Sequence, residues 1–140
     1  MINYYTIILT ITTTFIITII VLNYLSIYKN EYFNSKNNDI YNDTKYIKNM
    51  LQNNQFRYII DVRTIPEVKQ GYYPNSINIP IQEFNINKLY QIIPNIKKKD
   101  NILIYCRSGR RSKIAYQILK NNNFDNVYYL NGSYQLLLDS

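Results

Sequence analysis

The first 28 residues of the chain carry no charged side chain, and this feature limits the possible fold more than any other. Residues 5–27 consist mainly of isoleucine, leucine, valine, phenylalanine and threonine. A helix needs about 20 predominantly apolar residues to cross a bilayer, and it can return threonine hydroxyls to its own backbone. Tyrosines near both ends of the run suit the two membrane interfaces. We therefore expect residues 1–28 to form a transmembrane anchor, with residues 5–27 in contact with the membrane.

Two other interpretations explain this run less well. A cleaved signal peptide would have a basic start, a shorter apolar run and a small-residue cleavage site, none of which occurs here. A buried helix of a soluble domain would have to be apolar on every face. Lysines follow the run, and the positive-inside rule places such residues in the cytosol. We expect a single-pass membrane protein with a cytosolic C-terminal domain, because of Lys29, Lys36, Lys45 and Lys48.

The composition excludes several kinds of functional site. The chain has no histidine and a single cysteine, which rules out Ser-His-Asp triads, Cys-His dyads, His-based metal sites, Cys-x-x-Cys motifs and intrachain disulfides. We therefore expect no metal and no cofactor, and a lone thiol suits a reducing compartment.

The formal net charge is +7. The lysines at 97–99 are nevertheless typical of a solvated turn, and without a nucleic-acid-binding motif we expect no nucleic-acid partner.

The sequence changes character twice beyond the anchor. Residues 29–40 are polar, asparagine-rich and without periodicity, which predicts a linker. In residues 41–140, short β-rich runs alternate with helix-like segments, which predicts an α/β domain with a mainly parallel sheet flanked by helices. Such sheets bind ligands at the carboxyl ends of their strands. The expected strands are 56–62, 77–79, 102–105 and 127–130, and the expected helices are one starting near Asp43 or Thr44, then 66–69, 86–93, 112–120 and a short last one.

The single cysteine lies in a basic loop between an expected strand and an expected helix. Loop amides that point inward and a helix N-terminus both favour a bound anion. A thiol in such a place ionises more readily than a free one, and the thiolate is the nucleophile. An inert core cysteine would need none of these neighbours. We expect Cys106 to be catalytic, and we expect an anionic substrate to be bound by Arg107, Ser108, Gly109, Arg110, Arg111 and Ser112.

This loop and the segments on either side of it resemble rhodanese (sulfurtransferase) domains. The resemblance extends over residues 41–138, and the matching segments occur in the family's order. It implies a rhodanese-like α/β fold in which Cys106 carries the sulfur. Asp61, Arg63 and Glu67 would be structural support, with Arg63 and Glu67 as a buried or partly buried pair. The matching segments are Ile60-Asp61-Val62-Arg63, Glu67, Gly71, Pro74 to Pro80, the loop itself, and Phe124 to Gly132.

The resemblance also implies a reaction. The Cys106 thiolate would attack the outer sulfur of a small anionic donor such as thiosulfate, which would leave a persulfide on the enzyme. A thiol or cyanide would then accept the sulfur, in two displacements. The chain departs from the family pattern at Tyr72, where the family has histidine, at Asn75-Ser76 in place of Gly-Ala, and at Ser133 in place of glycine.

Two alternatives to this function have different consequences for the loop. The domain could be a membrane-anchored, non-catalytic interaction module of the same family, although such a module has no need of an intact cysteine loop. Phosphatases and arsenate reductases with a related scaffold are disfavoured. The phosphatases place an arginine six positions after the cysteine, whereas this chain has Ser112 there and Arg111 one residue earlier.

Overall fold

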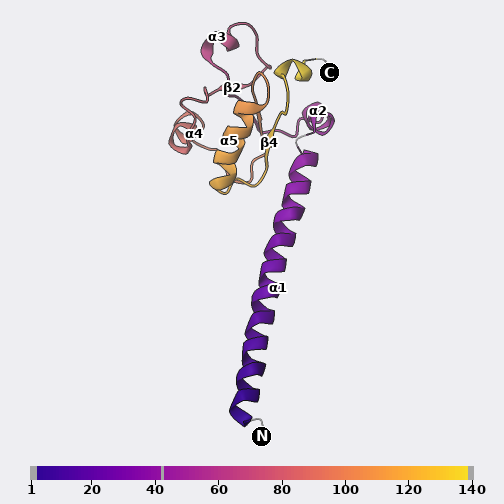
Figure 1. Ribbon diagram of the computed structural model, residues 1–140. Coiled ribbons are helices and arrows are strands. Elements are labelled where there is room, and N and C mark those ends of the chain that lie inside the picture. Colours follow the sequence, from indigo (N-terminus) through magenta and orange to yellow (C-terminus); the bar gives the residue numbers. More distant parts are fainter. Residues whose placement is uncertain (1–2, 42, 139–140) are drawn as a thin grey trace. The chain divides into compact units, whose positions relative to one another are not determined.

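The computed structural model describes residues 3–41 and 43–138, and the chain divides near Asp39 into two compact units. The first unit consists of most of a single long helix, α1 (Tyr4–Tyr41). The second unit contains a four-stranded sheet with its helices (Figure 1). Each unit is described separately below.

Helix α1 contains the apolar run. Its stretch Tyr4–Lys29 is long and apolar enough to cross a membrane, and it has no buried residues. The threonine hydroxyls donate hydrogen bonds to carbonyl oxygens three residues earlier, as expected from the sequence, so these polar groups are satisfied within the helix. The bonds, 2.6–3.0 Å long, come from Thr6, Thr10, Thr12, Thr13, Thr14 and Thr18.

The segment that we expected to be a polar linker, residues 29–40, is helical and forms most of the last part of α1. A polar, non-periodic sequence argues against an amphipathic face but does not by itself end a helix. The segment contains neither proline nor glycine. Extension of an existing helix requires no new nucleus, so α1 continues past the apolar run.

The second unit is built on a fully parallel sheet, as predicted. Its strands lie in the order β2-β1-β3-β4, and every neighbouring pair is parallel. All four expected strands are present; β3 has the expected bounds, and the other three are shorter than expected by one to three residues. The four strands are β1 (Tyr58–Asp61), β2 (Ile77–Asn78), β3 (Ile102–Tyr105) and β4 (Val127–Tyr129).

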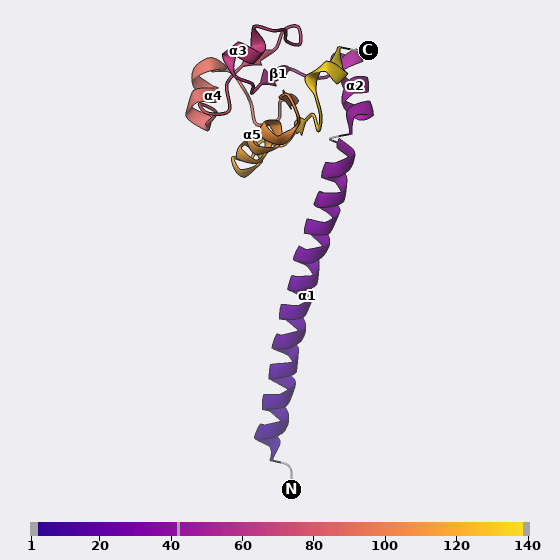
Figure 2. The ribbon, with the colours of Figure 1, turned by 45° about the horizontal axis from the view of Figure 1, so that its top comes forward.

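Helices cover both faces of this sheet. The central strand β3 is buried along its whole length, and its side chains alternate between two apolar clusters. Ile102 and Ile104 pack on the face covered by α4 (Ile86–Ile92) and α5 (Arg110–Asn121). Leu103 and Tyr105 pack with residues of α2 (Thr44–Gln52) and of the 3₁₀ helix η1 (Tyr134–Leu137). Figure 2 shows α2 away from α4 and α5.

The short helix α3 (Ile65–Val68) follows β1 and starts with a capping box. The backbone N–H and the hydroxyl of Thr64 both donate to the Glu67 carboxylate, at 3.0 and 2.8 Å. These bonds satisfy groups that a helix start otherwise leaves unpaired. They also fix the Glu67 carboxylate at the carboxyl end of the sheet, next to the cysteine loop.

Candidate active site

The cysteine loop lies where the carboxyl ends of the parallel strands meet. Cys106 follows β3 directly, and the loop ends at Gly109, which caps α5 in the left-handed conformation (φ 88°). A Cβ atom at this position would lie 3.0–3.1 Å from the backbone of Asn131 and Gly132, in the segment after β4. Glycine is therefore required here both by its backbone angle and by the close approach of the neighbouring chain.

The Cys106 sulfur is fully buried and is held by hydrogen-bond donors. The Gly109 amide donates to Sγ at 3.1 Å, and the Ser112 hydroxyl lies 3.6 Å from it. Burial by itself raises the pKa of the thiol. The Ser112 hydroxyl and the amides of Ser112, Ser108 and Arg111 outweigh that effect, so the pKa of Cys106 lies below its ordinary value. The site thus stabilises a thiolate, or another anionic sulfur at the same place.

The Ser112 hydroxyl also contacts two backbone carbonyl oxygens. Its Oγ lies within donor distance of the carbonyl oxygens of Gly109, at 2.8 Å, and Leu130, at 3.1 Å. Ser112 therefore connects the cysteine loop to the end of β4. It also makes the largest single contribution that lowers the thiol pKa. The sequence placed Ser112 among the substrate-binding residues, and the structure places it beside the sulfur.

The three loop arginines have different surroundings. Arg111 makes a bidentate pair with Glu67, with both N–O distances 2.7 Å, and its positive charge also acts on the Cys106 sulfur. Arg107 is exposed and lines a pocket, whereas Arg110 is exposed at the first turn of α5. Arg111 thus already holds a carboxylate, and the binding of an anionic substrate by the loop arginines stays a prediction.

The pairing of the structural residues also differs from the expected one. Arg63 and Glu67 were expected to form a pair, but Arg63 instead binds Asp61, two residues earlier. Its Nη2 donates to Asp61 Oδ2 at 2.6 Å, and the side chains of both residues are almost completely buried. Arg63 touches Glu67 only through the Glu67 backbone oxygen, at 3.5 Å. The Glu67 carboxylate is therefore available to Arg111.

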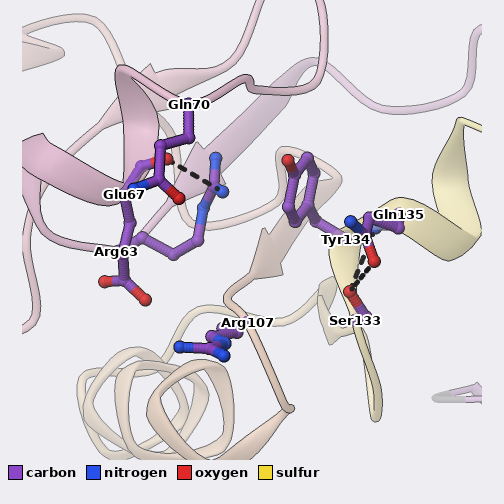
Figure 3. A pocket seen from close by; sticks show the side chains of 7 residues that line it. All are labelled: Arg63, Glu67, Gln70, Arg107, Ser133, Tyr134 and Gln135. Atoms are coloured by element: carbon purple, nitrogen blue, oxygen red, sulfur yellow. Dashed lines mark hydrogen bonds between the residues drawn. The ribbon is translucent and has the colours of Figure 1, made fainter.

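A pocket of about 310 Å³ opens beside the loop. Figure 3 shows the Arg63 guanidinium against the Tyr134 ring, with Arg107 below them in this view; the guanidinium carbon lies 3.9 Å from the ring centroid. Cys106 lies outside this lining, so its sulfur is adjacent to the pocket rather than exposed in it. The lining consists of Arg63, Glu67, Gln70, Arg107, Ser133, Tyr134 and Gln135.

Four pocket residues were not singled out from the sequence, namely Gln70, Ser133, Tyr134 and Gln135. Gln70 follows α3, and the other three lie at or just before η1. A positional signal could have found the last three, because they follow the carboxyl end of a strand in a parallel sheet, where ligands bind. Within the described ranges 3–41 and 43–138, no cluster of side chains could hold a metal ion.

Comparisons with known proteins place this geometry in a family. The sequence matches the rhodanese-like domain family over residues 43–139. It is 33% identical over 104 residues to a tRNA uridine(34) hydroxylase of Buchnera aphidicola (subsp. Baizongia pistaciae), which covers 73% of this chain and 33% of that protein. It is also 33% identical over 86 residues to the adenylyltransferase and sulfurtransferase UBA4 of Saccharomyces cerevisiae, covering 57% of this chain and 20% of UBA4. The chain thus spans a third or less of these curated relatives.

Solved structures share the fold. The human single-domain sulfurtransferase TSTD1 superposes with a TM-score of 0.55 at 20% identity, covering 67% of this chain and 90% of that one. A rhodanese-like domain protein of Staphylococcus aureus gives a TM-score of 0.53 at 26% identity, covering 67% and 86%. The family match covers more than half of the chain and includes the cysteine loop. The chain therefore belongs to the rhodanese-like family.

Proposed function

We propose that this protein is a sulfurtransferase that carries sulfur as a persulfide on Cys106. The observation that carries the proposal is the set of donors around Sγ: the Gly109 amide at 3.1 Å and the Ser112 hydroxyl at 3.6 Å. Preorganised donors of this kind stabilise a negative sulfur without rearrangement. The name of one relative, the sulfurtransferase UBA4, supports this chemistry, whereas the name tRNA uridine(34) hydroxylase denotes another reaction.

The first displacement loads the enzyme. The Cys106 thiolate attacks the outer sulfur of thiosulfate, a new S–S bond forms, and the bond within thiosulfate breaks with release of sulfite. The electron pair of the broken bond leaves with sulfite, and the persulfide keeps its negative charge on the terminal sulfur. The same amides and the Ser112 hydroxyl stabilise the thiolate before the step, and an already ionised thiol needs no general base. This suits a chain without histidine.

The second displacement returns the enzyme to its starting state. Cyanide or a thiolate attacks the terminal sulfur of the persulfide, and the Cys106 thiolate leaves.

We further propose that residues 4–29 anchor the protein in a membrane with the rhodanese-like domain in the cytosol, in keeping with the apolar helix and the lysines after it. Protease added to the cytosolic side of sealed vesicles should digest the domain, and digestion only from the opposite side would contradict this orientation.

The test compares the full chain in detergent with its Cys106→Ser variant. Thiosulfate should add one sulfur atom to the wild-type protein, visible by mass spectrometry, and cyanide should release it as thiocyanate. The variant should do neither, because the chain has no other thiol. Thiocyanate formed by the variant at the wild-type rate would contradict the mechanism.

One observation favours the non-catalytic alternative, namely the complete burial of the cysteine side chain. A donor can reach this sulfur only if the loop opens. The same experiment separates the two functions. A wild-type protein that folds but never acquires the extra sulfur would be an interaction module.

A further inference from the structure

We infer that the pocket beside the loop is the acceptor site and that it selects negatively charged thiols, with Arg107 as the residue that determines this specificity. This inference rests on the proposed sulfur transfer and extends it from the chemistry at Cys106 to the identity of the acceptor. It is carried by three features of the pocket: its charge, its polarity and size, and its place next to the sulfur.

The net charge of the pocket lining comes from one arginine, Arg107. Three of its seven lining residues are charged. Arg63 is neutralised by Asp61 and Glu67 by Arg111, with N–O distances of 2.6 and 2.7 Å. Within the part of the chain that the structure describes, Arg107 has no ion pair. The pocket therefore offers one uncompensated positive charge and no free carboxylate that would attract a cation.

The remaining lining is polar but neutral. It presents two carboxamides, a hydroxyl and a phenol, from Gln70, Gln135, Ser133 and Tyr134. No aliphatic side chain lines the pocket, so a hydrophobic acceptor would gain little there. The volume of about 310 Å³ lies at the lower end of small-molecule sites, and a thiosulfate ion alone would fill only part of it. These features favour a small hydrophilic thiol with a carboxylate or another anionic group.

The pocket also lies where an acceptor must approach. Arg107 follows Cys106 directly in the chain, and Glu67 holds Arg111, whose charge acts on the sulfur. The inner sulfur is buried, but the terminal sulfur of a persulfide lies about 2 Å from the inner sulfur, beyond it in the side chain. In the transfer step the acceptor thiolate forms a bond to this terminal sulfur, the Cys106 S–S bond breaks, and its electron pair stays on the Cys106 thiolate. The product is the persulfide of the acceptor.

The experiment uses three simple thiols that differ in charge: 3-mercaptopropionate, 2-mercaptoethanol and cysteamine. The full-length protein is first loaded with thiosulfate and freed of donor, and the loss of its extra sulfur is followed for each thiol. Rates are divided by the thiolate fraction and by the rate of the same thiolate with a small-molecule disulfide, so that neither the ionisation nor the intrinsic nucleophilicity of the thiols enters. We expect the wild type to react about two- to fivefold faster with 3-mercaptopropionate than with 2-mercaptoethanol. We expect cysteamine to react slowest. Salt should weaken this preference.

Arg107→Gln should abolish the preference and leave the loading by thiosulfate measurable. The matched control is Lys113→Gln, which removes an exposed positive charge from the first turn of α5 but not from the pocket lining. It should keep the wild-type preference. Arg107→Lys should keep part of it, because the charge remains while the planar fork that matches a carboxylate is lost.

The outcomes separate the two proposals. If thiosulfate never loads the wild type, the proposed sulfur transfer itself fails. If loading is normal but Arg107→Gln keeps the preference for 3-mercaptopropionate, the acceptor site is not at this pocket. If Lys113→Gln loses as much preference as Arg107→Gln, a general positive field explains the selectivity, and the assignment to Arg107 is overturned.

Discussion

Each of two arginine–carboxylate pairs contributes one residue to the lining of the same pocket, and the pairs differ in their surroundings. In the Asp61–Arg63 pair the N–O distance is 2.6 Å, and the two side chains are 0% and 3% exposed. In the Glu67–Arg111 pair the N–O distance is 2.7 Å, and the two side chains are 24% and 22% exposed. The chemistry of the two pairs is the same, but their access to water is not. The difference indicates that the first pair maintains the fold and that the second acts on the reactive sulfur.

The contacts of each pair support this division. Besides Asp61, Arg63 binds the carbonyl oxygen of Gly71 at 2.8 Å and stacks on the ring of Tyr134. It thus connects the end of β1 to the turn after α3 and to η1. Arg111 forms its bidentate pair with Glu67, and it also interacts with Cys106. The buried pair Asp61–Arg63 contacts structural elements, whereas the partly exposed pair Glu67–Arg111 interacts with the Cys106 thiol.

The largest effect is expected from Arg63→Ala. Removal of one partner of a buried pair leaves an uncompensated charge, here the Asp61 carboxylate, and costs about 3–5 kcal/mol of stability. Urea unfolding of the full chain in detergent, followed by tyrosine fluorescence, measures this loss. The matched control is Lys88→Ala, which breaks the more exposed Glu83–Lys88 pair at 3.7 Å. That change should cost about 1 kcal/mol or less. A similar cost for both variants would remove the distinction between buried and exposed pairs.

A smaller effect is expected from Glu67→Gln, and it should depend on pH. The Arg111 guanidinium, opposed by partial burial and assisted by Thr64, holds the pKa of the Glu67 carboxyl well below its usual range. A lowered folded-state pKa contributes stability that is fully present above the unfolded value of about 4.3 and is lost as the pH falls below it. At pH 7 the variant should therefore be less stable than the wild type, by about 1 kcal/mol.

The difference between wild type and Glu67→Gln should shrink as the pH is lowered from 5 toward the folded-state pKa of Glu67. Urea midpoints of both proteins at a series of pH values give this comparison directly. Arg63→Ala should be less stable than the wild type throughout the series, because Arg63 also binds the Gly71 carbonyl oxygen and stacks on Tyr134. A constant difference for Glu67→Gln across the series would show that the Arg111 charge does not act on this carboxyl.

The elements of the domain could be predicted from the sequence because their signals are local. The apolar run of β3 and the helix after it needed no knowledge of other segments, and Gly109 was conspicuous because the chain has only three glycines. The helical conformation of the polar segment 29–40 was not predicted from the sequence. Its polar composition shows no amphipathic face, but the backbone of α1 continues through it without needing one.

The pairing of charges could not be predicted, because it depends on contacts between distant segments. Arg111 meets a carboxylate 44 residues earlier in the chain, and only the capping box of α3 aims that carboxylate toward the loop. The pocket wall formed by η1 is similar: Tyr134 reaches Arg63 only because β4 ends at the same edge of the sheet as β1. Residue types and spacing predicted that Cys106 lies in a loop between a strand and a helix, but not the groups that surround it.

The smallest effect is expected on the thiol itself. Arg111→Gln should raise the pKa of Cys106, because it removes a positive charge that acts on the sulfur. Ser112→Ala should raise it more, because the Ser112 hydroxyl makes the larger contribution. The pH dependence of alkylation by iodoacetamide measures both changes, and the signal is unambiguous because Cys106 is the only cysteine.

A control from the other pair completes the comparison. Arg63→Lys keeps a charge beside Asp61, and the alkylation profile of this variant should match the wild type wherever the protein remains folded. An unchanged profile in Arg111→Gln, or an equal shift in Arg63→Lys, would contradict the assignment of the partly exposed pair to the sulfur. If the shifts follow the expected order, the carboxylate of Glu67 acts on the thiol only by holding Arg111. Glu67→Gln should then raise the thiol pKa no more than Arg111→Gln does.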